Sequence, residues 1–174
     1  LARLGLSSGK YFLATCHRAE NVDHEARLRA LVRAYEQLHA DYGYPVICSC
    51  HPRTRNKLTT FGIATNQPGL HFLEPLGFFD FVHLEQRAFC VLSDSGTVQE
   101  ESCLLGIPNV TTRDATERPE TVACGATILA GTDAERIRRA VAMIAGRRGG
   151  WVVPPEYLAP RVAETVMPYP MGNV

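Results

Sequence analysis

The chain has 174 residues, of which 45% are hydrophobic and 21% charged, a composition typical of one folded globular domain and not of a disordered chain. Its 18 basic and 18 acidic side chains give a formal charge of zero, so no overall field favours nucleic acid or an anionic membrane surface as a partner. The sequence holds no apolar run of about 18 residues, and no segment is predicted to span a membrane.

Six short apolar runs predict six β-strands. In chain order they cover residues 11–16, 45–50, 70–73, 89–92, 109–112 and 127–129. Several of the runs are continuously apolar rather than alternating, which indicates strands covered by helices on both faces of a sheet.

Helical patterns fill the intervals between these runs. The longest pattern carries apolar side chains at helical spacing, at Leu28, Leu31, Val32, Tyr35 and Leu38. Other helices are predicted around residue 84, over 98–105, over 122–125, and over 137–144 behind a cap at 132–133. The alternation of strand and helix predicts an α/β domain with a doubly wound parallel sheet, Rossmann-like in three αβα layers. Glycines and prolines replace the pattern after residue 146 and predict a surface excursion.

Six cysteines show neither a CxxC pair nor a paired metal-ligand spacing, and no metal site is predicted. They are Cys16, Cys48, Cys50, Cys90, Cys103 and Cys124. Cys48 and Cys50 are expected on one face of the second strand. We interpret all six as buried thiols of a protein in the reducing cytoplasm.

Polar clusters follow four of the predicted strands, at residues 17–21, 51–55, 93–97 and 113–120. Each cluster begins where its strand ends. In an open parallel sheet the carboxyl ends of the strands form the edge at which ligands bind. We therefore expect the ligand site at this edge.

The third cluster has the features of a phosphate cradle. Gly96 lets a backbone approach a ligand closely, Ser95 adds a hydroxyl, and the helix that follows offers unpaired N–H groups. Glu100 or Glu101 could accept the two hydroxyls of a ribose. The alternative is an ordinary helix cap at Ser95, with the acidic pair complementing the helix N-terminus.

The other clusters supply hydrogen-bond donors for an anion. His17 and Arg18 could meet a diphosphate, and His51 with Arg53 repeats that chemistry on the neighbouring loop. Alternatively, the loop residues are solvated, Arg53 belongs to the basic first turn of the next helix, and Arg118 forms an internal ion pair with a nearby glutamate. The coincidence of four such clusters favours an anionic ligand.

Several motifs are missing from the sequence. No GxGxxG follows a strand, which argues against a dinucleotide cofactor, and no GxxxxGK[ST] indicates a P-loop. Neither a GxSxG elbow nor an HExxH helix occurs.

Taken together, segments 17–21, 51–53, 92–101 and 113–120 resemble the C-terminal half of the non-hydrolysing UDP-N-acetylglucosamine 2-epimerase family. Their order and separation match from about residue 11 to 169. The family resembles glycosyltransferases of the GT-B type, in which two Rossmann-like domains hold a nucleotide sugar between them. The resemblance implies that residues 1–174 are the C-terminal, UDP-binding domain and that an N-terminal domain of the same polypeptide is missing. Residues 167–173 resemble the family's segment before its last helix crosses back to that domain.

The resemblance also implies roles for particular residues. His17 is expected to be the catalytic residue of this half, close to the diphosphate. Ser95 and Gly96 match the diphosphate site, Glu101 the ribose acceptor, and Phe81 the position that packs the uracil. Arg118 and Glu117 match an arginine-containing signature of the family that lines the same cleft. The expected substrate-binding residues are therefore Arg18, His51, Arg53, Phe81, Ser95, Gly96, Thr97, Glu101, Glu117 and Arg118.

The implied reaction eliminates UDP across C1–C2 of the sugar to give a glycal, then adds UDP back with the opposite configuration at C2. It uses no metal and no nicotinamide cofactor, and its acid/base carboxylates belong to the N-terminal domain. The resemblance further implies a cytoplasmic enzyme of surface-polysaccharide synthesis, homodimeric at full length, with no nucleic-acid or membrane partner.

Two departures from the family pattern leave the sugar open. Many members have glycine at the position of Thr97 and arginine at the position of Ala19, and this version looks closer to relatives acting on 6-deoxy or diacetamido-uronate sugars. The donor domain of a GT-B glycosyltransferase and a non-enzymatic nucleotide-sugar sensor are the alternative hypotheses.

Overall fold

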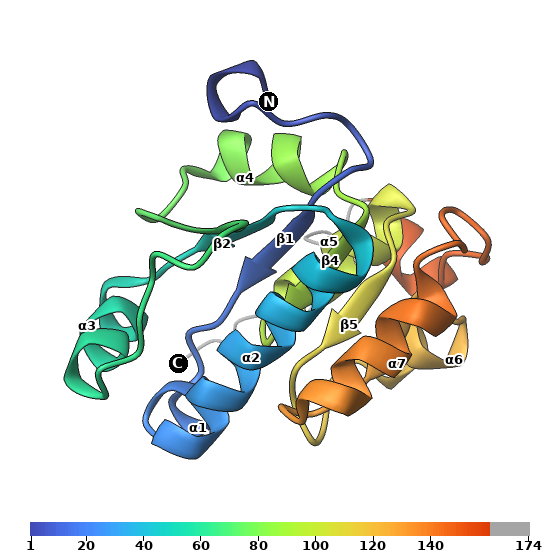
Figure 1. Ribbon diagram of the computed structural model, residues 1–174. Helices are drawn as coiled ribbons and strands as arrows, with labels where there is room; N and C mark the ends of the chain where they lie inside the picture. The colour runs from blue at the N-terminus through green and yellow to red at the C-terminus, as the bar shows by residue number, and fades with distance from the viewer. Residues whose placement is uncertain (161–174) are drawn as a thin grey trace, which may run out of the picture.

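A computed structural model describes residues 1–160 of the chain (Figure 1). The strands are β1 (Phe12–Thr15), β2 (Val46–Ser49), β3 (Leu70–Leu73), β4 (Cys90–Ser93), β5 (Asn109–Thr111) and β6 (Thr127–Leu129). The helices are α1 (Ala19–Val22), α2 (Glu25–Tyr42), α3 (Pro52–Thr60), α4 (Phe78–Glu85), α5 (Gly96–Leu105), α6 (Pro119–Ala123) and α7 (Ala134–Ile144). Short 3-10 turns cover Ala2–Leu4 and Pro155–Leu158.

The strands form one parallel sheet in the order β3-β2-β1-β4-β5-β6. This confirms the six predicted strands and the doubly wound, Rossmann-like class. Strands β1, β2 and β3 follow one another toward one side of the sheet. The chain then crosses back to β4, which lies beside β1, and strands β4, β5 and β6 follow one another toward the other side. The point at which the strand order reverses therefore lies between β1 and β4, and open sheets of this kind bind ligands there.

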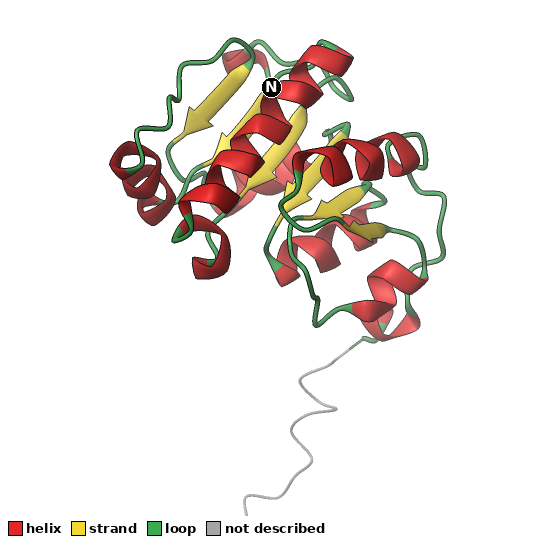
Figure 2. Cartoon of the chain, turned by 60° about the horizontal axis from the view of Figure 1, so that its bottom comes forward, coloured by secondary structure: helices red, strands yellow, loops and turns green. Residues whose placement is uncertain are grey.

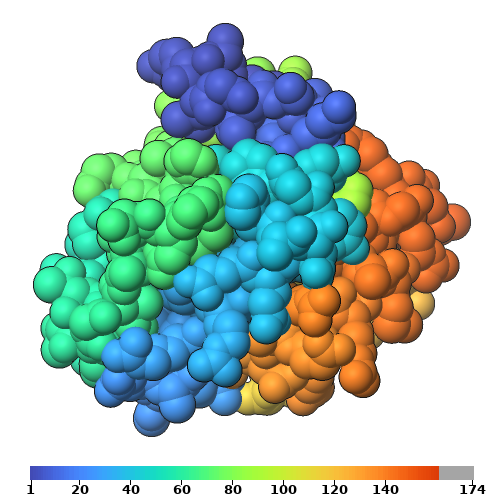
Figure 3. All heavy atoms as spheres, viewed as in Figure 1, coloured from blue at the N-terminus to red at the C-terminus, as the bar shows by residue number. Residues whose placement is uncertain are grey.

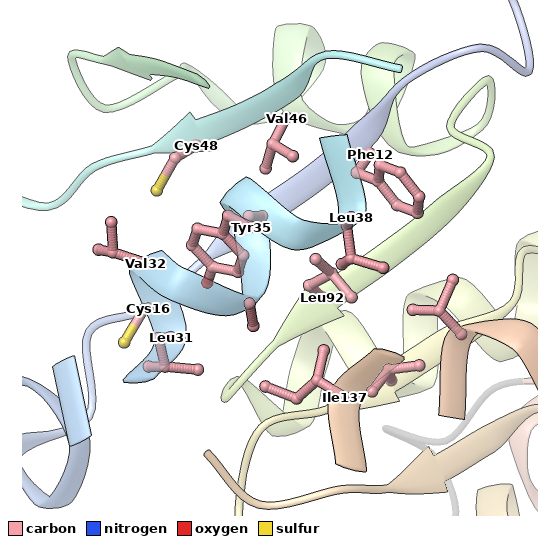
Figure 4. Close-up of a cluster of buried hydrophobic side chains, with 14 of the residues drawn as sticks. Phe12, Cys16, Leu31, Val32, Tyr35, Leu38, Val46, Cys48, Leu92 and Ile137 are labelled. Carbon is pink, nitrogen blue, oxygen red and sulfur yellow. The ribbon is translucent and has the colours of Figure 1, made fainter. Parts of the chain in front are cut away.

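Helices cover both faces of the sheet, as Figure 2 shows. Successive residues of β1 point to opposite faces: Phe12 belongs to one buried cluster with Tyr35 of α2 and Ile137 of α7, whereas Leu13 belongs to another with Leu84 of α4 and Val98 of α5. Figure 4 shows the first cluster, and Figure 3 shows atoms of α2 and α7 in contact over that face. Burial on both faces explains why several of the strands, such as β1 and β4, are almost continuously apolar.

Local sequence sets the ends of the principal helices. The apolar stripe of α2 is buried, and the helix ends at Gly43, whose φ of 67° is the left-handed conformation that glycine adopts without strain. The predicted cap of α7 is confirmed, since the side chain of Asp133 accepts a hydrogen bond from the backbone N–H of Arg136. Helix α6 begins at Pro119, earlier than predicted, because proline is tolerated in a first helical turn.

One detail differs from the sequence-based expectation. Strand β2 ends at Ser49, so Cys50 lies beyond it; all six cysteines are nevertheless free, and only Cys124 is not buried. Residues 147–160 are mostly exposed, as a surface excursion requires, but they are tied to the domain at two points. The indole of Trp151 donates to the carbonyl of Cys103 at 3.0 Å, and the hydroxyl of Tyr157 bonds Glu120, so aromatic residues with polar ends hold this segment.

The segment 167–173, which resembles the family's crossing segment, lies outside the described residues. Within residues 1–160, no helix has both the length and the apolar character needed to cross a bilayer.

Candidate functional site

The four polar clusters meet at one edge of the sheet. Thr15, the last residue of β1, pairs in register with Ser49 of β2 and with Ser93 of β4, which in turn pairs with Thr111 of β5. The loops that follow these residues therefore leave the sheet at the same level. In Figure 1 the arrowheads of β1, β2 and β5 point to this edge.

Asp94, directly after β4, is the centre of this edge. Its carboxylate is fully buried and accepts hydrogen bonds from the backbone N–H groups of His17 (3.1 Å) and Arg18 (3.0 Å). The side-chain amide of Asn21 donates to the same carboxylate and to the carbonyl of Thr112, both at 3.0 Å. One acid thus joins the ends of β1, β4 and β5 across the reversal point of the sheet.

The imidazole of His17 also faces Asp94, with Nδ1 at 3.2 Å from Oδ1, and about 40% of the side chain is exposed. The neighbouring Cys16 thiol is buried. Burial and the adjacent Asp94 raise the pKa of Cys16 well above its usual value, so the thiol stays protonated. Apart from the His17 ring, the groups around the Asp94 carboxylate are thus hydrogen-bond donors.

The amino end of α5 is not closed by a side chain. Ser95 is the N-cap residue, but among the described residues its hydroxyl pairs with that of Thr97 at 2.9 Å and caps no N–H of the first turn. The first turn also lacks an acidic residue. This differs from the capped end of α7 at Asp133, and it argues against Ser95 as an ordinary cap. The first N–H groups of α5 remain available to an anion.

Arg118 lies beside this helix end. If Gly96 carried a Cβ atom, that atom would lie 4.0 Å from the guanidinium carbon of Arg118. The side chain pairs with Glu100 and donates to the carbonyl of Glu117 at 3.1 Å. The internal ion pair considered from sequence therefore exists, with a partner on α5. Buried Gln99 donates to the carbonyl of Arg118 at 3.2 Å and so fixes its backbone against α5.

Glu117 has a protein partner. Arg113 is buried and donates to both oxygens of Glu117, at 2.9 and 3.0 Å, and to Glu20 at 3.0 Å. The Arg113 guanidinium holds the pKa of Glu117 down at about 2. Glu117 thus orders the loop after β5, a role that sequence reasoning missed because it considered only the ligand.

Glu101 differs from Glu117, because no other described side chain donates a hydrogen bond that would lower the pKa of its carboxyl group. Partial burial raises its pKa above the usual value, and repulsion from Glu100 adds to this. A half-buried carboxylate without a donor is suited to accept hydroxyl groups from a ligand.

His51 and Arg53 are exposed and engaged locally. His51 is the N-cap of α3, where its Nδ1 accepts the backbone N–H of Arg53 at 3.2 Å, and the Arg53 guanidinium pairs with Asp23. Arg53 therefore lies in the first turn of the next helix, as the alternative interpretation held. The turn is close to the loop after β1, since Thr54 donates to the carbonyl of Cys16 at 2.5 Å.

Arg18 lies at this edge, whereas Phe81 lies on α4, against one face of the sheet. Phe81 of α4 is partly buried and packs on the cluster that contains Leu84. The loop leading to α4 is anchored to the edge, because the hydroxyl of Ser49 accepts the N–H of Leu76 at 3.2 Å. Arg18 is fixed through its backbone by Asp94, and its side chain is partly buried.

Sequence reasoning named most residues of this edge but missed the organising roles of Asp94, Asn21, Gln99 and Arg113. All four are buried polar residues: Asp94 and Arg113 follow strands, whereas Asn21 and Gln99 lie in helices α1 and α5. Buried polar groups must be hydrogen-bonded. Among residues 1–160, no group of three or more His, Cys, Asp or Glu side chains is arranged to hold a metal.

An open parallel sheet with an uncapped helix end and an arginine beside its reversal point is typical of an α/β domain of the nucleotide-binding kind. The family model described as UDP-N-acetylglucosamine 2-epimerase matches residues 2–173. The chain belongs to this family.

Individual relatives agree with this assignment. The UDP-N-acetylglucosamine 2-epimerase of Methanocaldococcus jannaschii is 42% identical over 83% of the chain and 40% of its own length. The UDP-2,3-diacetamido-2,3-dideoxy-D-glucuronate 2-epimerase of Pseudomonas aeruginosa is 40% identical over 77% of the chain and 37% of its own length. The crystal structure of the M. jannaschii enzyme with UDP-GlcNAc and UDP superposes with a TM-score of 0.80, at 41% identity over 83% of this chain and 41% of that one. The chain spans about 40% of the length of such relatives.

Proposed function

We propose that the chain is the C-terminal, UDP-binding domain of a UDP-N-acetylglucosamine 2-epimerase, an isomerase of surface-polysaccharide sugar synthesis. The observation that carries the proposal is the uncapped amino end of α5, with Arg118 beside Gly96 and, on the same helix, Glu101, whose carboxylate has no donor among residues 1–160. A relative of 41% identity whose structure contains UDP supports this ligand.

Each part of UDP has a matching group in the proposal. The diphosphate takes the first N–H groups of α5, with the hydroxyls of Ser95 and Thr97 and the guanidinium of Arg118. The ribose hydroxyls donate to Glu101. Phe81 supplies an apolar surface for the uracil.

His17 assists departure of UDP in the proposed reaction. A base of the other domain removes the C2 proton, the C1–O bond breaks, and its electron pair leaves with the UDP oxygen. Donors at the carboxyl edge stabilise the charge that develops on the diphosphate. Arg18 and His17 follow β1 and provide such donors, and His51 and Arg53 extend the basic surface.

The remaining features of the whole protein are part of the same proposal. The longer relatives support an N-terminal domain in the same polypeptide, and we propose a homodimer at full length. Six free cysteines support a reducing cytoplasm. The P. aeruginosa relative supports a diacetamido-uronate sugar as the second candidate substrate.

The decisive experiment gives the longer protein that carries this chain one nucleotide sugar and no acceptor. NMR should show the C2 epimer forming from UDP-GlcNAc, or from the diacetamido-uronate derivative if that is the substrate. Sugar transfer that occurs only after an acceptor is added would identify a glycosyltransferase instead. Binding of UDP-sugars with neither epimer nor glycal formed would identify a sensor.

A further inference from the structure

The contact between His17 and Asp94 fixes more than a side-chain position. Oδ1 of Asp94 is 3.2 Å from Nδ1 of the ring, and the backbone N–H groups of His17 and Arg18 donate to the same carboxylate. An ionised carboxylate has no hydrogen to donate, so it acts as an acceptor toward the ring as well as toward the backbone groups. Nδ1 therefore carries a hydrogen, and the neutral ring leaves its lone pair on Nε2.

Other acids at this edge have other partners. Glu20 and Glu117 form ion pairs with Arg113, and Glu100 forms an ion pair with Arg118. Asp94 is fully buried, whereas the ring that it contacts is partly exposed. The buried acid therefore faces His17 from the protein side, and the exposed part of the ring is open to a ligand.

The carboxylate itself cannot reorient easily. Asn21, also fully buried, donates to Oδ2 of Asp94 and to the carbonyl of Thr112. The oxygen of the Asn21 amide accepts from Arg27 at 3.2 and 3.1 Å, and this fixes which way the amide points. Residues that follow β1, β4 and β5 thus hold Asp94 and His17 in place at the reversal point of the sheet.

We infer that Asp94 is a positioning residue of the reaction, which holds Nδ1–H of His17 so that Nε2 is directed to the ligand, and which balances the charge of the protonated ring, the form in which Nε2 donates to the departing UDP. This rests on the proposed function, and it extends that function to a residue that touches no substrate. Carboxylate–imidazole pairs of this kind fix both tautomer and ring orientation.

The first test is the tautomer of His17 in this chain without ligand. With 15N-labelled histidine, the ring signals that vanish in His17→Gln should report Nδ1–H. An Nε2–H ring in the unaltered chain would overturn the inference, and this outcome does not depend on what the protein binds.

The second test is Asp94→Asn. An asparagine can keep its oxygen toward the backbone donors and turn its amide to Nδ1, which would reverse the tautomer to Nε2–H. Asp133→Asn makes the same chemical change at the cap of α7, where asparagine caps equally well, and should leave His17 unaltered. An unchanged His17 tautomer in folded Asp94→Asn would also overturn the inference.

Kinetics of the longer protein then separate the inference from the proposed function. Asp94→Asn should lower kcat about 10²–10⁴-fold, the contribution of a positioned acid or base, and change KM little. A loss confined to KM would contradict positioning. If the unaltered protein forms no epimer, the proposed function fails, while the tautomer result still decides the role of Asp94.

Discussion

Charged residues at the carboxyl edge divide into those that hold the loops and those left for a ligand. Arg113 is buried between Glu20 and Glu117, and these pairs order the loop after β5. Removing one partner of such a buried cation would leave it uncompensated. Glu101 has no comparable partner among the described side chains, and Arg118 is only partly buried. These two residues therefore give the sharpest tests of binding.

Arg118→Ala should weaken binding of both UDP and inorganic diphosphate to this chain. A charge-assisted contact contributes about 1.5–3 kcal/mol, so the Kd should rise about 10- to 150-fold. Calorimetry measures this, with Arg139→Ala as control, because Arg139 is exposed on α7 and pairs only with Glu135 in the described structure. Unchanged affinity in a folded variant would make Arg118 a structural partner of Glu100.

Glu101→Gln should distinguish the two halves of the ligand. If Glu101 accepts ribose hydroxyls, UDP should bind about 10-fold or more weakly, and inorganic diphosphate should bind as before. The same calorimetric titration with both ligands measures the difference. An equal loss for both would show that the carboxylate acts on the helix end and not on the ribose.

At the scale of elements, the ligand edge depends on how α4 and α5 pack beneath the sheet. Glu85, the last residue of α4, is fully buried and accepts a hydrogen bond from Ser102 of α5 at 2.7 Å. Its second oxygen has no partner in the described structure. Burial raises the pKa of Glu85 to about 7, although the hydrogen bond from Ser102 favours the ionised form and opposes this shift.

Glu85→Gln should therefore change how stability depends on pH. The pKa is higher in the folded chain than in the unfolded one, so the folded chain binds more protons between about pH 4.5 and about pH 7, and stability falls as pH rises through this window. The loss is at most about 3 kcal/mol. Urea unfolding near pH 5 and near pH 8 should show it in the unaltered chain and not in Glu85→Gln. Parallel profiles for the two proteins would contradict this.

At the scale of the whole molecule, the site is one edge of one sheet. In the proposed function it binds the diphosphate and the ribose of UDP from one side. Epimerisation requires one group to remove a proton from C2 and another to deliver a proton to the opposite face of C2. Each group must lie within hydrogen-bond distance of the proton that it transfers. One histidine on one domain cannot serve both faces, and a single domain has nothing to close upon to exclude water.

The 174-residue chain alone should therefore bind UDP and turn nothing over. The measurement is NMR of UDP-GlcNAc incubated with the chain in deuterated water, with deuterium at C2 as the readout. Deuterium that appears in proportion to the chain and is lost in His17→Ala would place the whole chemistry on this domain and contradict the expectation.

The strands, the main helices and the edge at which the polar clusters meet can all be predicted from the sequence, because the periods of apolar residues and the ends of strands are local features. Ser95, Gly96 and Arg118 also stand out in the sequence, since their residue types carry recognisable chemistry. The ion pairs between distant loops become visible in the fold alone: Glu117 with Arg113, Arg53 with Asp23, Arg118 with Glu100. The fold also places Asp94 against His17, 77 residues away in sequence. The partner of a charged group depends on distances between loops that are far apart in the chain, and no local pattern encodes those distances.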